Sequence, residues 1–303
     1  MKMRIAVPSS FLADHLADSD TAPVIWNIDD SGPVPDIEML VTGKPDHDLN
    51  RARVSEIPSL RLIQLMSLGY DWIEGFRPDG VPVATARGVL EPFAAEHAIG
   101  LLIAGFRRLD IDQENRRRRL WIPRTTTSIR NTTVILLGYG GLGKTIEHML
   151  SPFHPGHIIR VARTARRLQD GTAVHSVREL PSLAARADAL ICTLPGTPST
   201  SKVVNDAVFN ALHDGAVIVN VGRGTTLDTL ALQTHLESQR LVAMLDVVDP
   251  EPLGTDSPLW TLPNVVVTPH VGGEVTQAEH ELLGLIQQQV SALHTGADLQ
   301  NLV

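Results

Sequence analysis

The segment from Thr132 to Lys144 constrains the fold more than any other part of the chain. It begins with β-branched and aliphatic residues, passes through a G-x-G-x-x-G pattern at Gly138, Gly140 and Gly143, and leads into an amphipathic stretch. This order predicts a buried strand, a tight turn and a helix. Gly138 would permit the turn, Gly140 would let the backbone approach a pyrophosphate, and Gly143 would let helix and strand pack closely. Because a helix N-terminus favours phosphate, the flanking patterns indicate a dinucleotide site rather than an ordinary turn with the same spacing.

Length and composition limit the class of protein. With 303 residues, 43% of them hydrophobic, about two domains with ordinary cores are expected. No apolar run reaches the ~18 residues that span a bilayer, and the N-terminus shows no signal sequence, so we expect a cytoplasmic protein without a membrane partner. The net charge of −8 argues against nucleic acid as a partner. The single cysteine, Cys192, lies in an apolar stretch, which predicts a buried packing residue rather than a nucleophile.

Hydrophobic patterns divide the chain into two α/β regions. In residues 1–95 the pattern predicts a small parallel sheet with helical crossovers. Its strands are expected at 4–7, 24–28, 37–41, 61–66 and 81–84. A helix should begin at Pro92 and end near Arg108, and a last helix should cover 274–293. From residue 132, continuous apolar runs are typical of a doubly wound sheet that is buried on both faces. Its strands are expected at 132–138, 157–162, 188–193, 215–220, 241–246 and 264–268.

Chemically suggestive side chains follow the predicted strands of this second region. In a doubly wound fold, ligands bind beyond the carboxyl ends of the strands, and that is where these residues lie. They are Gly138, Arg163, Thr193, Arg223, Asp246 and His270. The coincidence predicts one ligand site along a single edge of the sheet.

The segment after the second strand of this sheet bears on the choice of cofactor. An NAD-binding unit usually places an acidic residue there, to accept from the ribose 2′-hydroxyl. This chain instead has Arg163, Thr164, Arg166 and Arg167, with no acid. Guanidinium groups suit a 2′-phosphate in charge and geometry, so NADP(H) is favoured over NAD(H). The alternative is that these arginines begin an exposed helix and that the protein uses NAD(H).

Three later segments carry charged or titratable residues held by Gly or Pro. They are Gly222-Arg223-Gly224, Asp249-Pro250-Glu251-Pro252 and Pro269-His270-Val271-Gly272. An acid, a histidine and an arginine together suit the reduction of a carbonyl beside a carboxylate. The loop Thr193-Leu194-Pro195, with few side chains, would suit the cover of an adenosine or ribose, although an ordinary loop explains it equally well.

The chain resembles the D-isomer-specific 2-hydroxyacid dehydrogenases, the family of glyoxylate/hydroxypyruvate reductases, D-lactate dehydrogenases and phosphoglycerate dehydrogenases. The matching motifs are Gly138–Gly143, Leu194-Pro195, Gly222-Arg223-Gly224, Glu251-Pro252-Leu253 and Thr268-Pro269-His270. Before residue 138 the match is looser and rests on Ser67-Leu68-Gly69, which is similar to the family's substrate loop. The chain departs from the pattern in three places: Gly222 replaces the family's usual alanine, Thr225–Thr229 replaces a Val-Asp-Glu segment, and Tyr70 adds bulk beside the substrate loop.

This resemblance implies a role for each residue of the acid, histidine and arginine set. His270 would donate a proton to the carbonyl oxygen of a 2-oxo acid as hydride leaves the nicotinamide. Glu251 would hydrogen-bond the other ring nitrogen, and Arg223 would bind the substrate carboxylate. Backbone N–H groups at Leu68 and Gly69 would bind the other side of that carboxylate. No metal is expected, because the arginine and the histidine polarise the carbonyl.

The resemblance also implies the cofactor contacts. Asp246 would meet the nicotinamide end of the cofactor. The full set expected is Gly138, Tyr139, Gly140, Gly141, Leu142, Gly143, Arg163, Thr164, Arg166, Thr193, Leu194, Pro195, Val221, Gly222, Asp246 and Gly272.

The fold implied is α/β, with two doubly wound parallel-sheet domains. A Rossmann nucleotide-binding domain would cover 96–273, and a smaller, discontinuous flavodoxin-like substrate domain would combine 1–95 with 274–303. A homodimer is expected, with contacts around 100–130, a region whose four-arginine run is better explained as a solvated or subunit-facing surface than as a phosphate site. Two alternatives stay open: a phosphoglycerate-dehydrogenase-like enzyme that uses NAD, and a cofactor-sensing interaction protein like the family's co-repressors.

Overall fold

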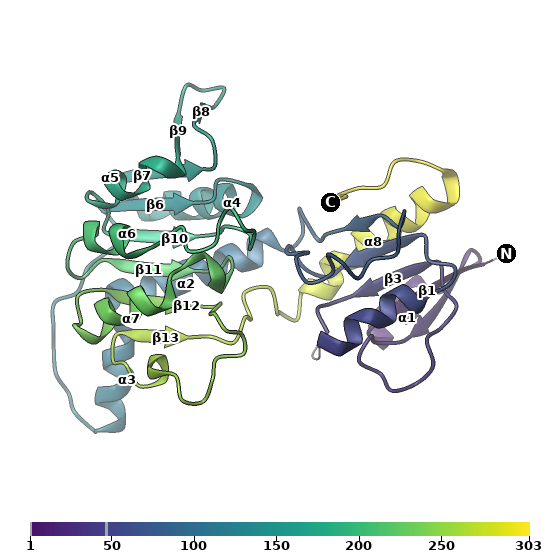
Figure 1. Cartoon of the computed structure of the whole chain (residues 1–303), viewed down its shortest axis with the longest axis horizontal. Helices are drawn as coiled ribbons and strands as arrows, with labels where there is room; N and C mark the ends of the chain where they lie inside the picture. Colours follow the sequence, from purple (N-terminus) through teal and green to yellow (C-terminus); the bar gives the residue numbers. More distant parts are fainter. Residues whose placement is uncertain (1, 46–47) are drawn as a thin grey trace. The chain divides into compact units, whose positions relative to one another are not determined.

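The computed structural model describes residues 2–45 and 48–303. The chain divides into two compact units, Pro92–Gly272 and a smaller one that combines the residues up to Glu91 with Gly273–Val303. These units divide at 91/92 and 272/273, a few residues from the domain boundaries expected at 95/96 and 273/274. The α/β fold with two parallel sheets is confirmed (Figure 1).

The larger unit, all of whose residues are described, contains an eight-stranded sheet in the order β13-β12-β11-β10-β6-β7-β9-β8. The strands are β6 (Thr133–Leu137), β7 (His157–Ala162), β8 (Arg166–Arg167), β9 (Ala173–Ser176), β10 (Ala189–Cys192), β11 (Val217–Asn220), β12 (Val242–Leu245) and β13 (Val265–Val267). Every pairing is parallel except that of β8 with β9. The strand order reverses between β6 and β10, and this reversal creates the crevice in which doubly wound folds bind ligands.

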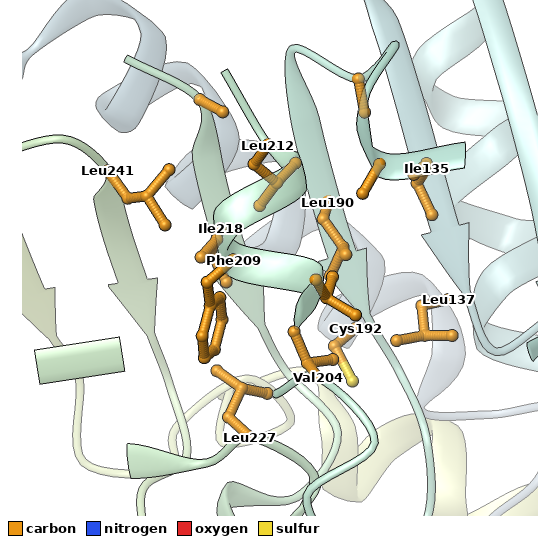
Figure 2. Close-up of a cluster of buried hydrophobic side chains, with 14 of the residues drawn as sticks. Ile135, Leu137, Leu190, Cys192, Val204, Phe209, Leu212, Ile218, Leu227 and Leu241 are labelled. Atoms are coloured by element: carbon orange, nitrogen blue, oxygen red, sulfur yellow. The ribbon is translucent and has the colours of Figure 1, made fainter. Parts of the chain in front are cut away.

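Helices cover both faces of this sheet. They are α2 (Glu91–Arg107), α4 (Gly141–Leu150), α5 (Leu180–Ala184), α6 (Asp206–Ala211) and α7 (Thr229–Glu237), with 3-10 turns η2 (Ser151–Phe153), η3 (Val177–Glu179), η4 (Gly224–Thr226) and η5 (Pro258–Trp260). Helix α3 (Leu109–Arg117) follows α2 and has no buried residue. Alternate residues of β6 enter different cores, because successive side chains of a strand point to opposite faces. Ile135 packs with α5, α6 and α7 in the cluster shown in Figure 2, whereas Leu136 packs with α2 and α4. Both faces of the central part of the sheet are therefore buried against helices, as the continuous apolar runs predict.

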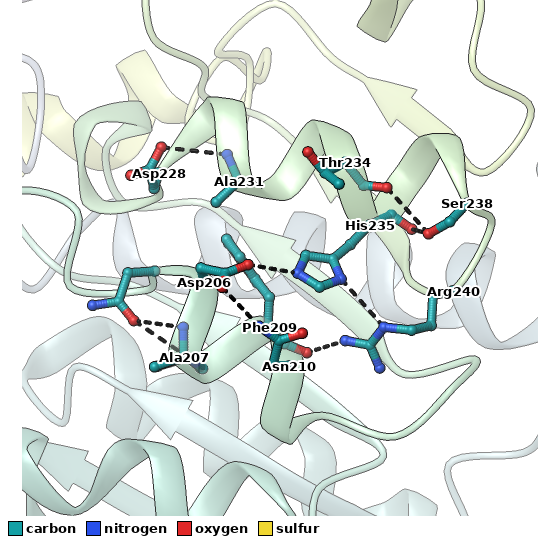
Figure 3. A network of polar contacts seen from close by, with 12 residues as sticks. Asp206, Ala207, Phe209, Asn210, Asp228, Ala231, Thr234, His235, Ser238 and Arg240 are labelled. Carbon is teal, nitrogen blue, oxygen red and sulfur yellow. Dashed lines mark hydrogen bonds and ion pairs between the residues drawn. The ribbon is translucent and has the colours of Figure 1, made fainter.

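A partly buried network of polar side chains connects α6 and α7. His235 on α7 is 6% exposed, and its Nε2 lies 3.1 Å from Oδ1 of Asp206 on α6 (Figure 3). Its Nδ1 accepts a hydrogen bond of 3.2 Å from Nε of Arg240, whose guanidinium also donates to the carbonyl oxygen of Leu212 at 2.6 Å. The imidazole thus bridges an acid and a guanidinium through its two ring nitrogens.

The smaller unit contains a parallel sheet whose described strands follow the order β2-β1-β3-β4-β5, the flavodoxin-like arrangement. The strands are β1 (Met3–Val7), β2 (Thr21–Ile25), β3 (Met39–Thr42), β4 (Leu62–Leu65) and β5 (Val83–Ala84), with α1 (Ser10–Leu16), η1 (Asp48–Glu56) and α8 (Ala278–Thr295). The C-terminal segment completes this unit: buried Gln289 on α8 donates to Oε1 of Gln64 at 3.0 Å, and Leu302 bridges antiparallel to Ala84.

Several sequence expectations need correction. The strand expected at 24–28 is Thr21–Ile25, and the helix expected from 274 begins at Ala278. The helical crossovers of the small sheet are confirmed for α1 and the 3-10 helix η1, whereas residues 26–38 connect β2 to β3 and residues 66–82 connect β4 to β5 without a helix. The hairpin of β8 and β9 was not expected, and the alternative that Arg166 and Arg167 begin a helix is wrong, because they form β8.

Candidate active site

The glycine turn joins β6 to α4, with close contacts at Gly138 and Gly143 and open space at Gly140. Gly138 adopts a φ of 104°, a conformation that favours glycine. A side chain at Gly143 would overlap the carbonyl oxygen of Gly138, so helix and strand pack too closely there for any Cβ. Gly140, the N-cap of α4, has no atom within 4 Å of the position that a Cβ would take. This open space at a helix N-terminus fits a pyrophosphate.

A charged network supports the turn from the side of β7. The hydroxyl of Tyr139 donates to Oε2 of Glu147 at 2.5 Å, and Nε of Arg160 donates to the same carboxylate oxygen at 2.8 Å. Burial raises the pKa of Tyr139, and its hydrogen bond to Glu147 raises it further. Arg166 on β8 donates to the carbonyl oxygen of Tyr139 at 3.1 Å. The unexpected hairpin thus brings one of the predicted cofactor arginines onto the glycine turn.

The other two residues predicted to recognise the ribose follow β7 directly. Arg163 and Thr164 are exposed, and β7 is hydrogen-bonded to β6, with the amide of Gly138 donating to the carbonyl oxygen of Val161 at 2.9 Å. The strand pairing therefore places both residues beside the turn, at the carboxyl edge of the sheet.

The loop after β10 packs against both the glycine turn and the segment after β11. Oγ1 of Thr193 donates to the carbonyl oxygen of Gly138 at 2.8 Å. A Cβ at Gly222 would lie 2.5 Å from the carbonyl oxygen of Leu194 and 2.8 Å from its nitrogen. A Cβ at Gly196 would lie 3.2 Å from Cγ of Arg223, so the stem of this arginine runs along the loop. Thr193 and Leu194 are therefore packed between the glycine turn and the segment after β11, whereas Pro195 is exposed. Their contact with a cofactor stays a prediction.

His270 and Glu251 form a hydrogen-bonded pair. Nδ1 of the histidine lies 2.7 Å from Oε1 of the glutamate, and the two side chains are 38% and 28% exposed. A carboxylate acceptor at Nδ1 favours the tautomer with the proton on that nitrogen, which leaves Nε2 as the ring nitrogen that a ligand could contact. Arg223 follows β11 on the same sheet edge, and its Nη1 donates to the carbonyl oxygen of Gly222 at 2.8 Å.

Asp246 is the most buried acid of this edge, with 3% exposure. Its Oδ1 accepts from Thr268 Oγ1 at 2.6 Å and from the Val271 amide at 3.0 Å, and its Oδ2 accepts from the Gly272 amide at 3.0 Å. Burial raises the pKa of Asp246, but hydrogen bonds from His97 and Thr268 outweigh it, so the pKa lies below its usual value. Asp246 is thus an ionised carboxylate bound to the turn that carries His270.

Comparison with known proteins identifies the family. Residues 99–272 match the family model described as D-isomer specific 2-hydroxyacid dehydrogenase, NAD binding domain. The chain belongs to the D-isomer specific 2-hydroxyacid dehydrogenases. It is an NAD(P)-dependent dehydrogenase.

Relatives within this family include reductases and dehydrogenases of different substrates. The chain is 31% identical to glyoxylate/hydroxypyruvate reductase A of Yersinia enterocolitica, over 76% of this chain and 73% of the relative. It is 29% identical to human glyoxylate reductase/hydroxypyruvate reductase, over 82% and 80% of the two chains. It is 31% identical to D-3-phosphoglycerate dehydrogenase of Mycobacterium leprae, over 90% of this chain but 54% of the relative.

A solved structure matches the whole dehydrogenase chain. It is an NADPH-dependent glyoxylate/hydroxypyruvate reductase from Sinorhizobium meliloti in complex with NADP and malonate. The TM-score is 0.81 at 28% sequence identity, and the match covers 100% of this chain and 97% of the other.

The structure shows what surrounds Gly222 and Tyr70, two positions at which this dehydrogenase departs from its family pattern. Gly222 lies against the backbone of Leu194, so the usual alanine would require a shift of that loop. Tyr70 packs against the core of the smaller unit, among residues such as Trp72 and Ile63. Leu68 and Gly69 follow β4 in that unit, where Oγ of Ser67 donates to the carbonyl oxygen of Gly69 at 2.7 Å. Their contact with substrate stays a prediction.

Three remaining expectations concern metals, membranes and the cysteine. Among residues 2–45 and 48–303, His, Cys, Asp and Glu side chains form no group of three that could hold a metal ion. None of the helices in this described part is long and apolar enough to cross a membrane. Cys192 is fully buried in β10, where its Sγ lies 3.3 Å from Oγ1 of Thr226, and this confirms a packing role.

Proposed function

We propose that this dehydrogenase reduces small 2-oxo acids such as glyoxylate or hydroxypyruvate, with NADPH as the preferred hydride donor. The observation that carries the proposal is the His270–Glu251 pair at 2.7 Å, on the same sheet edge as Arg223 and the glycine turn. The names of the relatives from Yersinia and human support this substrate class.

The chain's own residues account for proton transfer and for substrate orientation. When bound, the cofactor supplies the hydride from its nicotinamide ring. His270 would then give the proton on its Nε2 to the carbonyl oxygen, while Glu251 holds Nδ1 and stabilises the charged imidazole. Arg223 would bind the substrate carboxylate and polarise the carbonyl beside it. Leu68 and Gly69 remain proposed backbone donors to that carboxylate.

The test of this activity is a panel of initial rates. NADPH and NADH oxidation is measured with glyoxylate, hydroxypyruvate, pyruvate and phenylpyruvate, and NAD reduction is measured with D-3-phosphoglycerate. We expect the highest kcat/KM for NADPH with glyoxylate or hydroxypyruvate. His270→Gln should lower turnover by ~10²–10⁴-fold, the usual contribution of a general acid, whereas His148→Gln on the exposed surface of α4 should not. A folded, cofactor-binding protein without turnover of any 2-oxo acid contradicts the proposal.

The preference for NADPH rests on the arginines beside the glycine turn. Arg166 is anchored on the carbonyl oxygen of Tyr139, and Arg163 follows the neighbouring strand. The solved structure of the Sinorhizobium reductase contains bound NADP. Arg163→Ser with Arg166→Ser should raise the KM for NADPH ~10-fold or more and leave that for NADH nearly unchanged. Arg167→Ser is the matched control, because Arg167 donates to Gly171 within its own hairpin.

We also propose a cytoplasmic homodimer. Apolar side chains stand exposed along α3 and the following segment, with Trp121 95%, Ile122 55%, Leu109 44% and Leu120 41% exposed. They line one groove together with Arg116 and Arg119. An apolar patch with an arginine rim is typical of a protein interface. Light scattering should give twice the chain mass for the wild type and the chain mass for Trp121→Glu, whereas Leu230→Glu, at an exposed leucine on α7, should stay dimeric.

A further inference from the structure

The turn that carries His270 is fixed by the carboxylate and the backbone of Asp246. His270 adopts a φ of 55°, in the left-handed region that a residue with a side chain rarely occupies. Its amide donates to the carbonyl oxygen of Asp246 at 2.8 Å. The next two amides, of Val271 and Gly272, donate to the two carboxylate oxygens at 3.0 Å each. The position of the His270 backbone therefore depends on where this buried carboxylate is held.

Two side chains hold the carboxylate. Thr268 donates from its hydroxyl to Oδ1 at 2.6 Å. The second is His97, whose Nε2 lies 3.1 Å from the same Oδ1 and 3.1 Å from the hydroxyl oxygen of Thr268. Because the threonine proton points to the carboxylate, its oxygen is free to accept from the imidazole. His97 thus completes a three-membered cluster with Asp246 and Thr268.

His97 comes from a part of the chain remote from the strand ends. It lies on α2, whose residues Ala98, Leu101 and Leu102 are buried in the core beneath the sheet. Its ring also packs against the turn, because a Cβ at Gly272 would lie 3.5 Å from its Cδ2. The helix therefore supplies a rigid base from which the imidazole reaches the carboxylate.

We propose that His97 is a positioning residue for the hydride-transfer reaction: it holds Asp246, and through Asp246 the turn that places His270. The inference rests on the proposed function for its kinetic consequence, whereas its effect on the turn is independent of any activity. His97 donates a hydrogen bond to a buried ionised acceptor, and loss of such a bond loosens the groups that the acceptor binds.

The test uses three single-substitution variants of the 303-residue chain. His97→Phe keeps a ring but removes the N–H donor, and His97→Gln keeps an N–H donor of similar reach. His175→Leu is the control, because it removes another imidazole–carboxylate pair, the one with Glu179 at 3.1 Å on the surface of the same unit. If His97→Phe does not fold, His97→Leu takes its place. Thr268→Val is a further variant, which removes the other side-chain donor to Oδ1 of Asp246.

The first measurement is amide hydrogen exchange over the peptide that covers 268–273. We expect ~10-fold faster exchange there in His97→Phe, recovery in His97→Gln, and wild-type exchange in His175→Leu. The second measurement is steady-state kinetics, in which His97→Phe should lower kcat ~10-fold with less than a twofold change in the KM for the 2-oxo acid. His97→Gln should regain most of the loss.

These readouts separate the two claims. If the wild type reduces no 2-oxo acid, the proposed function fails, and hydrogen exchange still tests the turn. Wild-type exchange and kcat in His97→Phe overturn the role of His97. Equal losses in His97→Phe and His97→Gln also overturn it, because the effect would then not depend on the N–H donor.

Discussion

We expect Gly143 and Gly140 to have different roles in the glycine turn, helix–strand packing and cofactor binding, and substituting each one with alanine distinguishes these roles. At Gly143 a methyl would overlap the carbonyl oxygen of Gly138 and lie 3.2 Å from its carbonyl carbon. Both atoms belong to the backbone, so relief requires the strand or the helix to move. Overpacking of this kind costs up to about 3 kcal/mol, and the better helix propensity of alanine returns about 1 kcal/mol. Gly143→Ala should therefore destabilise the protein by about 2 kcal/mol, or about 4–8 °C in Tm.

At Gly140 the expected result is the opposite. Nothing lies within 4 Å of the added methyl, and φ is −94°, so the free protein accommodates alanine without strain. The weaker N-cap costs roughly 0.5–1 kcal/mol, and the lower entropy of the unfolded chain offsets about the same amount. Stability should thus stay unchanged. If a pyrophosphate occupies the open space, however, the methyl overlaps it and lowers cofactor affinity about tenfold or more.

The assay pairs thermal unfolding with a titration of NADPH followed by calorimetry. Gly100→Ala, in the interior of α2 with no atom within 4 Å, is the matched control. It should gain about 0.5–1 kcal/mol in stability and bind NADPH as the wild type does. Wild-type affinity in Gly140→Ala would refute the assignment of this turn to the pyrophosphate. Wild-type stability in Gly143→Ala would refute the packing argument.

Three further predictions concern buried polar groups. Because the folded-state pKa of Asp246 lies below its unfolded value, its stabilisation is present above the unfolded pKa and is lost as the pH falls through the folded pKa. Denaturant unfolding of Asp246→Asn should therefore differ most from the wild type near pH 7, and a difference that grows in acid would contradict this. His235→Leu should lower the unfolding free energy by about 1–3 kcal/mol without changing kcat, because it leaves the N–H of Arg240 without its acceptor; an unchanged melting curve would contradict the network. Burial raises the pKa of Cys192, so iodoacetamide should label it only on unfolding, and mass spectrometry would show rapid labelling of native protein if this is wrong.

The central strands of the larger unit's sheet could be predicted because they are buried on both faces. A run such as Ala189–Cys192 is apolar at every position, and only a central parallel strand explains that pattern at this length. The candidate site residues that follow the predicted strands could be identified in the same way, because each comes after such a run. Since the carboxyl ends of parallel strands share one edge of the sheet, these residues could be placed near one another without knowing the conformation of the loops.

Short or polar strands escaped prediction for physical reasons. Arg166–Arg167 form a two-residue exposed strand that has no apolar side chain to bury, so no hydrophobic pattern marks it. The strand Thr21–Ile25 contains Pro23, which lacks an N–H donor and is tolerated because β2 is an edge strand. Because the residues after Pro23 are apolar, the sequence pattern predicts a strand that begins at residue 24 rather than at Thr21.

The contact of His97 with Asp246 could not be predicted from local patterns. The two residues lie on a helix and at a strand end, 149 positions apart in the sequence. Helix periodicity says only that His97 and the neighbouring Glu96 face different ways. Which of the two meets the sheet edge depends on how α2 is rotated in the core, and that rotation is a property of tertiary packing.

The central claim is hydride transfer to the carbonyl carbon of a 2-oxo acid, and isotope transfer tests it most directly. The enzyme is incubated with hydroxypyruvate and NADPH that carries deuterium at both C4 positions, and the product is analysed by mass spectrometry and chiral chromatography. We predict D-glycerate with one deuterium at C2, formed by the wild type and strongly reduced in His270→Gln. Product without deuterium, or of the L configuration, would contradict the account.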